Sequence, residues 1–208
     1  MRQSEKQMRI IGITGGAGAG KTLLMTYIKE RYACRILLAD EVAKALQQPG
    51  EVCYEQIVNL LGKDIIGLDG TIIPSKMAER IFRDKELLKA VNTIVHPAVK
   101  QYIMEEIRKE ANRGESAFFF LEAALLIECG YMGIVEEMWY VYAREEVRRK
   151  RLKESRGYSE AKIDSIMQSQ LPENTYREHC GFIIDNSGEA AYAYEQIDNK
   201  MGEYLWKK

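Results

Sequence analysis

The sequence predicts an α/β fold in which a parallel sheet of about five strands is covered by helices on both faces. Three observations predict it. Continuous apolar runs, each as long as a buried strand, alternate along the chain with segments of helical character. A glycine-rich segment follows the first run and leads into a helical pattern. Acidic and amide residues stand where other runs end, as at the ligand-binding edge of such a sheet.

The apolar runs define the expected strands in chain order, at residues 9–14, 35–39, 117–121, 138–142 and 182–184. The second ends at Asp40, the third at Glu122, and the fifth at Asp185 followed by Asn186. Because the carboxyl ends of parallel strands meet at one edge of a sheet, we expect these side chains on one rim with the glycine-rich segment.

The glycine-rich segment, residues 15–22, reads GGAGAGKT and matches the phosphate-binding pattern G-x-x-x-x-G-K-[ST] of a P-loop. Glycines let backbone N–H groups wrap a phosphate, and the following helix presents its N-terminus to the anion. A lysine here reaches the β- and γ-phosphates, and a threonine hydroxyl can ligate Mg²⁺. We therefore expect a P-loop NTPase fold of three layers, with ATP held by Gly15, Gly16, Ala17, Gly18, Ala19, Gly20, Lys21, Thr22 and Leu23.

Two other interpretations of this segment were weighed against the phosphate loop. One is a tight turn without function, against which the Lys-Thr pair and the flanking patterns argue. A dinucleotide-binding G-x-G-x-x-G could begin at Gly16 and Gly18, with Asp40 on the ribose. Its third glycine would fall on Lys21, which excludes it.

Composition narrows the possible classes of protein. The chain has 208 residues, enough for one α/β domain with a sizeable core, and its net charge of −1 argues against nucleic-acid binding through bulk positive charge. The longest apolar run, 117–127, is broken by Glu122 and is too short for a membrane span. Residues 1–8 are polar, lack a signal-peptide core and are expected to fray. Scattered cysteines without a Cys-x-x-Cys indicate reduced thiols of a cytoplasmic protein.

Two segments differ in character from the alternating pattern. Residues 51–113 read as helices between the second and third strands, and we expect a helical, substrate-binding insertion within a single domain whose core is 9–50 and 114–208. Residues 145–179 are rich in charge. They predict either a helical lid over the triphosphate or a solvated helix face, and the sequence leaves both open.

Short segments that follow the glycine-rich loop carry a family resemblance. They are residues 39–44, 68–71, 81–82, 96–97, 125–128, 170–172 and 183–188. In their order and spacing, from residue 10 to about 190, they resemble the dephospho-CoA kinase family, P-loop kinases similar to nucleoside-monophosphate kinases. The resemblance implies that ATP, with Mg²⁺, phosphorylates the 3′-hydroxyl of dephospho-CoA to give CoA.

The catalytic candidates are Asp40, Lys21 and an arginine of the charged segment. Asp40 is expected to accept or orient the proton of the attacking hydroxyl, or else to cap a helix that starts at Glu41. Arg148, Arg151 and Arg156 are candidates for stabilising charge on the transferring phosphoryl group. Arg151 matches the first arginine of the family's lid motif, and Arg156 could replace the second, where Ser155 stands.

The remaining candidates concern the metal, the nucleotide and the acceptor. Thr22 and Glu122 are expected to hold Mg²⁺, with a plain salt bridge as the alternative for Glu122. His96 either contacts the acceptor or, with Pro97, ends a helix. The resemblance further implies acceptor contacts by Lys44 and Glu128, besides Asp40, and adenine contacts by Asn186 and Gly188.

The chain departs from the family pattern at several positions. The substituted positions are Leu38, Lys44, Pro74, Ala124, Ser155, Tyr176 and Gly181. They motivate two alternatives: a P-loop kinase of another nucleoside, nucleotide or small alcohol, and a non-catalytic ATP-binding relative. The expected partners are ATP and dephospho-CoA, with no nucleic acid or membrane, and the expected state is a monomer or weak homo-oligomer.

Overall fold

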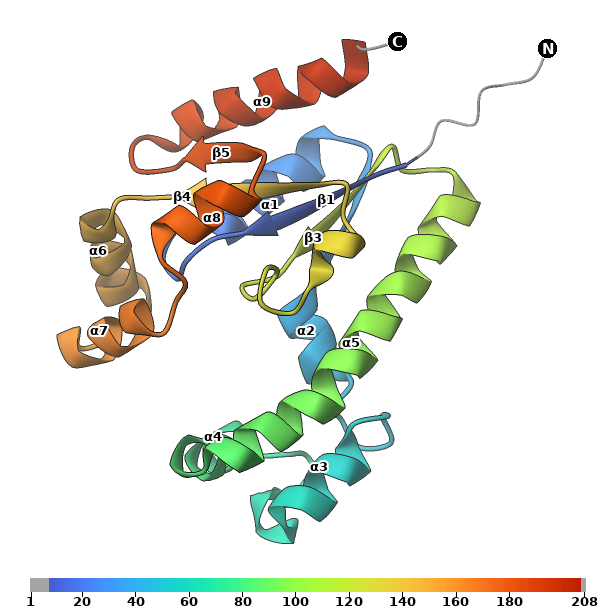
Figure 1. The fold of residues 1–208 in the computed structure, drawn as a ribbon, viewed down its shortest axis with the longest axis vertical. Coiled ribbons are helices and arrows are strands. Elements are labelled where there is room, and N and C mark those ends of the chain that lie inside the picture. The colour runs from blue at the N-terminus through green and yellow to red at the C-terminus, as the bar shows by residue number, and fades with distance from the viewer. Residues whose placement is uncertain (1–7, 207–208) are drawn as a thin grey trace. The chain divides into compact units, whose positions relative to one another are not determined.

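The computed structural model describes residues 8–206 (Figure 1). The segment expected to fray lies outside the described residues except for Met8, which is buried. The described residues form two compact units, 8–36 with 110–206, and 37–109. Residues 37–50 thus belong to the second unit together with most of the segment in which the insertion was expected. Within this unit a backbone hydrogen bond of 3.1 Å from Cys53 to Leu46 joins the helix that contains Asp40 to the next helix.

The first unit is built on the predicted five-stranded sheet, in the order β2-β3-β1-β4-β5. The strands are β1 (Arg9–Thr14), β2 (Cys34–Leu38), β3 (Phe118–Glu122), β4 (Glu137–Tyr142) and β5 (Phe182–Asp185). The registers of β1 with β3, β1 with β4 and β4 with β5 are parallel. The expected strands are confirmed, with ends that shift by a residue: Ala39 is helical, and Glu122 and Asp185 are the last residues of their strands.

One face of the sheet packs against α1 (Lys21–Arg31) and α9 (Ala190–Trp206). Ile11 and Ile13 of β1 lie fully buried in this layer with Trp139 of β4. The other face is covered as well, because a Cβ on Gly12 would lie 2.6 Å from Leu126. A strand buried on both faces reads as a continuous apolar run, which is why the runs predicted the strands.

The charged segment folds as α6 (Glu145–Arg156), α7 (Glu160–Gln168) and α8 (Glu173–His179), after the short η2 (Tyr131–Gly133). Gly157 ends α6 in the left-handed conformation, with φ of 62°. Ser159 caps α7 by accepting a hydrogen bond from the backbone N–H of Lys162. None of the helices among residues 8–206 is long and apolar enough to cross a membrane.

The second unit is helical, as expected. It contains α2 (Ala39–Ala45), α3 (Tyr54–Leu61), η1 (Lys63–Ile65), α4 (Pro74–Arg83) and most of α5 (Lys85–Arg113). Pro74 is the first residue of α4, where its missing N–H costs nothing. The interpretation of His96-Pro97 as a helix stop is wrong, since α5 continues through Pro97. The favourable turns on both sides keep the helix, although Pro97 cannot donate to the carbonyl of Thr93.

Candidate functional site

The glycine-rich loop joins β1 to α1, as the motif predicts. Gly18 and Gly20 have φ of 78° and 93°, a left-handed conformation that side chains with a Cβ rarely adopt. Space is tight as well, because a Cβ on Gly18 would lie 2.7 Å from the carbonyl oxygen of Arg148. The loop ends where α1 begins at Lys21, so the positive end of the helix faces the phosphate position.

The side chain of Lys21 reaches back to the first residue of the loop. Its ammonium donates to the carbonyl oxygen of Gly15 at 2.7 Å and lies 3.5 Å from the carboxylate of Glu122. The salt bridge weighed for Glu122 is therefore present, and its partner is the P-loop lysine itself. Thr22 follows in the first turn of α1 with an exposed side chain. A hydroxyl, a carboxylate and an ammonium thus gather where the β- and γ-phosphates of a nucleotide belong.

The basic residues of α6 divide into two groups. Arg149 pairs with Glu145 and Asp164, both at 2.7 Å, on the solvated side of the helix. Arg148 and Arg151 instead reach the glycine-rich loop: Arg148 Nε donates to the Ala17 carbonyl at 2.9 Å, and Arg151 Nη1 to the Ala19 carbonyl at 3.2 Å. The charge run is therefore solvated at Arg149 and faces the glycine-rich loop at Arg148 and Arg151, whereas a lid over the triphosphate stays a prediction.

The segment after β5 also reaches the loop. Asn186 is 1% exposed, and its Nδ2 donates to the Ala19 carbonyl at 2.7 Å. The backbone carbonyl of Asn186 accepts a hydrogen bond from Arg151 Nη2 at 2.9 Å. Asn186 Oδ1 is buried without a hydrogen-bond partner among the described residues. Gly188 is exposed and does not line the cavity described next.

A cavity of about 490 Å³ opens beside the glycine-rich loop. It is lined by Gly16, Ala17, Gly18, Gly20, Lys21, Thr22, Leu23, Arg151, Leu152, Glu154, Ser155, Arg156 and Asn186. Most of the expected nucleotide residues are therefore brought together with the candidate Arg156. Ser155 donates its hydroxyl to the Arg151 carbonyl at 2.6 Å, so it satisfies a helix carbonyl. Arg156, one residue later, is the exposed cation of this wall.

Other candidates of the first unit lie outside that cavity. Glu128 is exposed in the turns after β3. The pKa of Tyr176 is raised mainly by burial of its own side chain and further by the negative charge of Glu128. Tyr176 is buried and stacks on Tyr140 with ring centroids 4.7 Å apart and planes within 5°. Burial raises the pKa of Tyr140 to about 12. The family's lysine position is thus filled here by an aromatic that packs on β4.

Asp40 and Lys44 belong to the second unit, on α2. Asp40 is exposed in the first turn, whereas the residue that precedes the helix is Leu38. The N-cap interpretation of Asp40 is therefore wrong, because the helix starts earlier than Glu41 and encloses Asp40. The Lys44 ammonium pairs with Glu41 at 2.7 Å, and that hydrogen bond raises its pKa.

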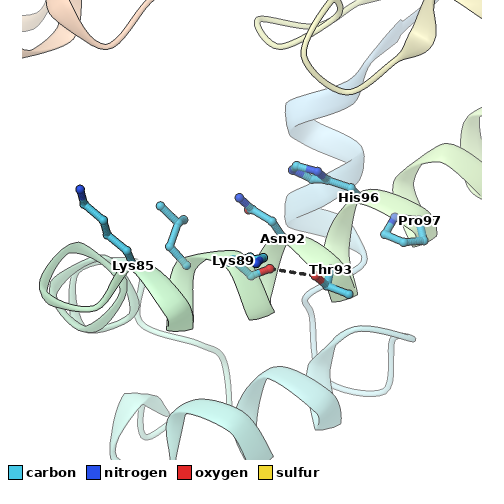
Figure 2. Close-up of a pocket in the computed structure, with 7 residues that line it drawn as sticks. Lys85, Lys89, Asn92, Thr93, His96 and Pro97 are labelled. Carbon is cyan, nitrogen blue, oxygen red and sulfur yellow. Dashed lines mark hydrogen bonds between the residues drawn. The ribbon is translucent and has the colours of Figure 1, made fainter.

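His96 lines a shallow groove of about 410 Å³ on α5 (Figure 2). Lys85, Asn92 and His96 project from the same side of the helix. The other lining residues are Leu88, Lys89, Thr93 and Pro97. Sequence reasoning missed this stripe, although its spacing of about one and two helical turns was a usable signal. Cationic, amide and apolar side chains together suit an acceptor with both phosphate and aliphatic parts.

Comparisons with known proteins agree with this geometry. A family model described as dephospho-CoA kinase matches residues 9–192. The dephospho-CoA kinase of Carboxydothermus hydrogenoformans is 31% identical over 198 residues, 95% of each chain. The solved structure of TT1252 from Thermus thermophilus aligns with a TM-score of 0.82 and 28% identity over 96% of this chain and 98% of that one.

A second solved structure supports the fold alone. The dephospho-CoA kinase of Campylobacter jejuni is 20% identical and aligns with a TM-score of 0.71, covering 94% of this chain and 96% of its own. Strand order, P-loop and the family match over nearly the whole length lead to one conclusion. The chain belongs to the dephospho-CoA kinase family, whose members use ATP to phosphorylate dephospho-CoA to CoA.

Proposed function

We propose that this chain transfers the γ-phosphoryl group of ATP to the 3′-hydroxyl of dephospho-CoA, and that its two units act as one kinase domain. One observation carries the proposal: Lys21, Thr22 and Arg156 share a cavity with the glycine-rich loop. Such a cavity offers backbone amides and cations to a chain of phosphates. Of the residues that the family pattern assigns to the acceptor, Asp40, Lys44 and His96 lie in the helical unit and Glu128 lies in the first unit.

Phosphoryl transfer needs positioning and charge stabilisation more than covalent chemistry. In the proposed mechanism Lys21 neutralises charge on the β- and γ-phosphates, and Glu122 holds its ammonium in place. Arg156 stabilises the charge that develops on the transferred group, in place of the arginine that Ser155 replaces. Arg151 holds the carbonyls of Ala19 and Asn186 and so shapes the nucleotide site.

The donor set suits Mg²⁺. Thr22 supplies a hydroxyl and Glu122 a carboxylate, which are the hard oxygen ligands that this ion prefers. Residues 8–206 contain no group of three or more His, Cys, Asp or Glu side chains placed to hold a metal. An ion held by one or two side chains, water and the substrate phosphates fits such a site. When bound, Mg²⁺ would neutralise phosphate charge, with Thr22 and Glu122 as its protein ligands.

Most of the residues proposed to bind the acceptor substrate belong to the second unit. We propose that Asp40 accepts or orients the proton of the attacking hydroxyl, because its carboxylate is exposed and does not cap the helix. Lys44 and His96 would contact the acceptor, and Glu128 of the first unit would do so as well. The groove of Lys85, Lys89 and Asn92 beside His96 supports this assignment, since it combines charge with apolar surface.

The family departures favour this reading over a different acceptor or a non-catalytic relative. Pro74 starts a helix, Ser155 bonds a helix carbonyl and Tyr176 packs on β4. Each of these three substitutions therefore has a local structural role. We also propose a cytoplasmic enzyme, a monomer or weak homo-oligomer, whose partners are small molecules and not nucleic acid or a membrane. The net charge of −1 and the reduced thiols of Cys34, Cys53 and Cys180 support this.

The test is the release of ADP from ATP and Mg²⁺ with and without dephospho-CoA, with Lys21→Ala as the control. We expect turnover that requires dephospho-CoA and disappears in the variant. ATP binding without turnover would contradict the proposal, and a panel of nucleosides and small alcohols would then identify another acceptor.

A further inference from the structure

Side-chain donors hold alternate carbonyl oxygens of the glycine-rich loop. They are Lys21 on Gly15 at 2.7 Å, Arg148 on Ala17 at 2.9 Å and Asn186 on Ala19 at 2.7 Å. The donors come from α1, from α6 and from the segment after β5. Separate parts of the first unit therefore fix the orientation of one short loop.

An anchored carbonyl also sets the direction of an amide. The peptide bonds of the described residues are trans, so the C=O and N–H of one peptide unit point in opposite directions. When Arg148 holds the carbonyl of Ala17, the N–H of Gly18 is turned to the other side of the loop. Amides turned in this way form the cradle for a phosphate.

Arg148 is itself held in place. A terminal nitrogen of its guanidinium donates to the side-chain oxygen of Gln170, between α7 and α8. A Cβ on Gly16 would lie 2.6 Å from that oxygen, so the pair rests directly on the loop. Arg148 does not line the nucleotide cavity, whereas Arg151 and Arg156 do.

We propose that Arg148, held by Gln170, is a positioning residue that presets the P-loop amides for the phosphates common to ATP and ADP. This rests on the proposed nucleotide site and deepens it. It also separates two functions within α6: Arg148 acts through the Ala17 carbonyl, whereas Arg156 acts on the transferred group. Nε and Nη2 of Arg148 are committed to Ala17 and Gln170, so the proposed function of Arg148 requires no contact with the γ-phosphate.

The test compares the dissociation constants of ATP and ADP by calorimetry in the presence of Mg²⁺, for the full chain. We expect Arg148→Ala to weaken both nucleotides by the same factor, about tenfold, as for loss of a charged hydrogen bond. Gln170→Leu should weaken the binding of ATP and ADP to a smaller degree. Gln170→Glu keeps a hydrogen-bond acceptor for Arg148 and should bind both nucleotides as the wild type does. The double variant Arg148→Ala/Gln170→Leu should bind no worse than Arg148→Ala alone.

The KM for dephospho-CoA should stay unchanged in these variants, which a general loss of structure would not allow. Lys150→Ala is the matched control, because that lysine lies on the same helix with a side chain 73% exposed. A loss confined to ATP, together with a fall in kcat, would overturn the proposal in favour of direct phosphoryl contact. Equal affinity in variant and wild type for both nucleotides would overturn it as well.

If Arg148→Ala does not fold, the Gln170→Leu and Gln170→Glu pair decides the question with the arginine intact. The nucleotide measurements use no acceptor. A failure of the chain to phosphorylate dephospho-CoA would therefore leave this result readable, and the two proposals can fail independently.

Discussion

The ammonium of Lys21 lies 3.5 Å from the carboxylate of Glu122, and both side chains are only 14% exposed. An ion pair with so little contact with water is weakly screened. Glu122 ends β3 and Lys21 begins α1, so neighbouring strands β1 and β3 bring the pair together. The pair therefore couples the phosphate-binding lysine to the proposed metal ligand.

Glu122→Gln should lower kcat by about tenfold to a hundredfold, because it removes charge beside the phosphates and one proposed Mg²⁺ ligand. The Mg²⁺ concentration for half-maximal ADP release should rise in the same variant. Glu115→Gln, an exposed acid before β3, is the control and should behave as wild type. An unchanged Mg²⁺ dependence would assign Glu122 to the salt bridge alone.

Asp40→Asn should lower kcat by more than about tenfold, as expected for loss of a general base or of its orienting hydrogen bond. The melting temperature should change little, because Asp40 is exposed and does not cap α2. Steady-state ADP release and thermal unfolding check both parts. Glu41→Gln, its neighbour in the same helical turn, should keep kcat near the wild-type value. A fall of less than tenfold in Asp40→Asn would rule out the catalytic assignment.

Arg156→Ala should lower kcat by about tenfold or more while the KM for ATP changes less, because the proposed contact strengthens as charge develops. Single-turnover kinetics measure this step. Lys153→Ala is a matched control, since Lys153 pairs with Glu160 on the surface. Unchanged turnover in Arg156→Ala would mean that this arginine does not replace the one missing at Ser155.

Tyr176→Ala should destabilise the protein by about 3 kcal/mol, because it removes a buried ring that stacks on Tyr140. Tyr176→Phe keeps the ring and should cost less than about 1 kcal/mol. Tyr176→Lys, which restores the family residue, should be about as destabilising as the alanine variant, since it buries a charge. Urea unfolding measures the free energies. A stable lysine variant would show that the stack is dispensable.

Asp198 of α9 should make stability depend on pH in the acid range. Its carboxylate accepts hydrogen bonds from Tyr27 and Tyr32 at 2.8 Å and 2.6 Å and lies 3.1 Å from Arg31. Although burial works in the opposite direction, these contacts lower the pKa of Asp198 from its usual 3.8. A carboxylate whose pKa is lowered by folding stabilises the folded state at pH values above its pKa in the unfolded chain. This contribution is lost as the pH falls through the lowered pKa of the folded state.

Asp198→Asn should therefore lower the melting temperature most near neutral pH. The difference from wild type should shrink below about pH 4. Thermal unfolding followed between pH 7 and pH 3, under buffers of equal ionic strength, measures it. A difference that stays constant over this range would show that the charge of Asp198 contributes nothing.

Local patterns were sufficient for the elements but not for their exact ends. The strand, loop and helix around Lys21 follow from consecutive residues, because glycine conformations and apolar runs are local properties. Local rules were wrong at His96-Pro97 and at Asp40. The rest of α5 outweighs the cost of one proline, and α2 starts before the residue that looked like its cap.

The succession of strands and helices along the chain, the phosphate loop and the family could all be predicted from the sequence. Only the tertiary structure decided which side chains hold that loop. Because β1 pairs with β4 and β4 with β5, the segments that follow β4 and β5 meet the loop that follows β1. Arg148 and Asn186 thus reach loop residues more than a hundred positions away, and Gln170 accepts a hydrogen bond from Arg148. Such contacts depend on the hydrogen-bonded order of strands, which no local pattern specifies.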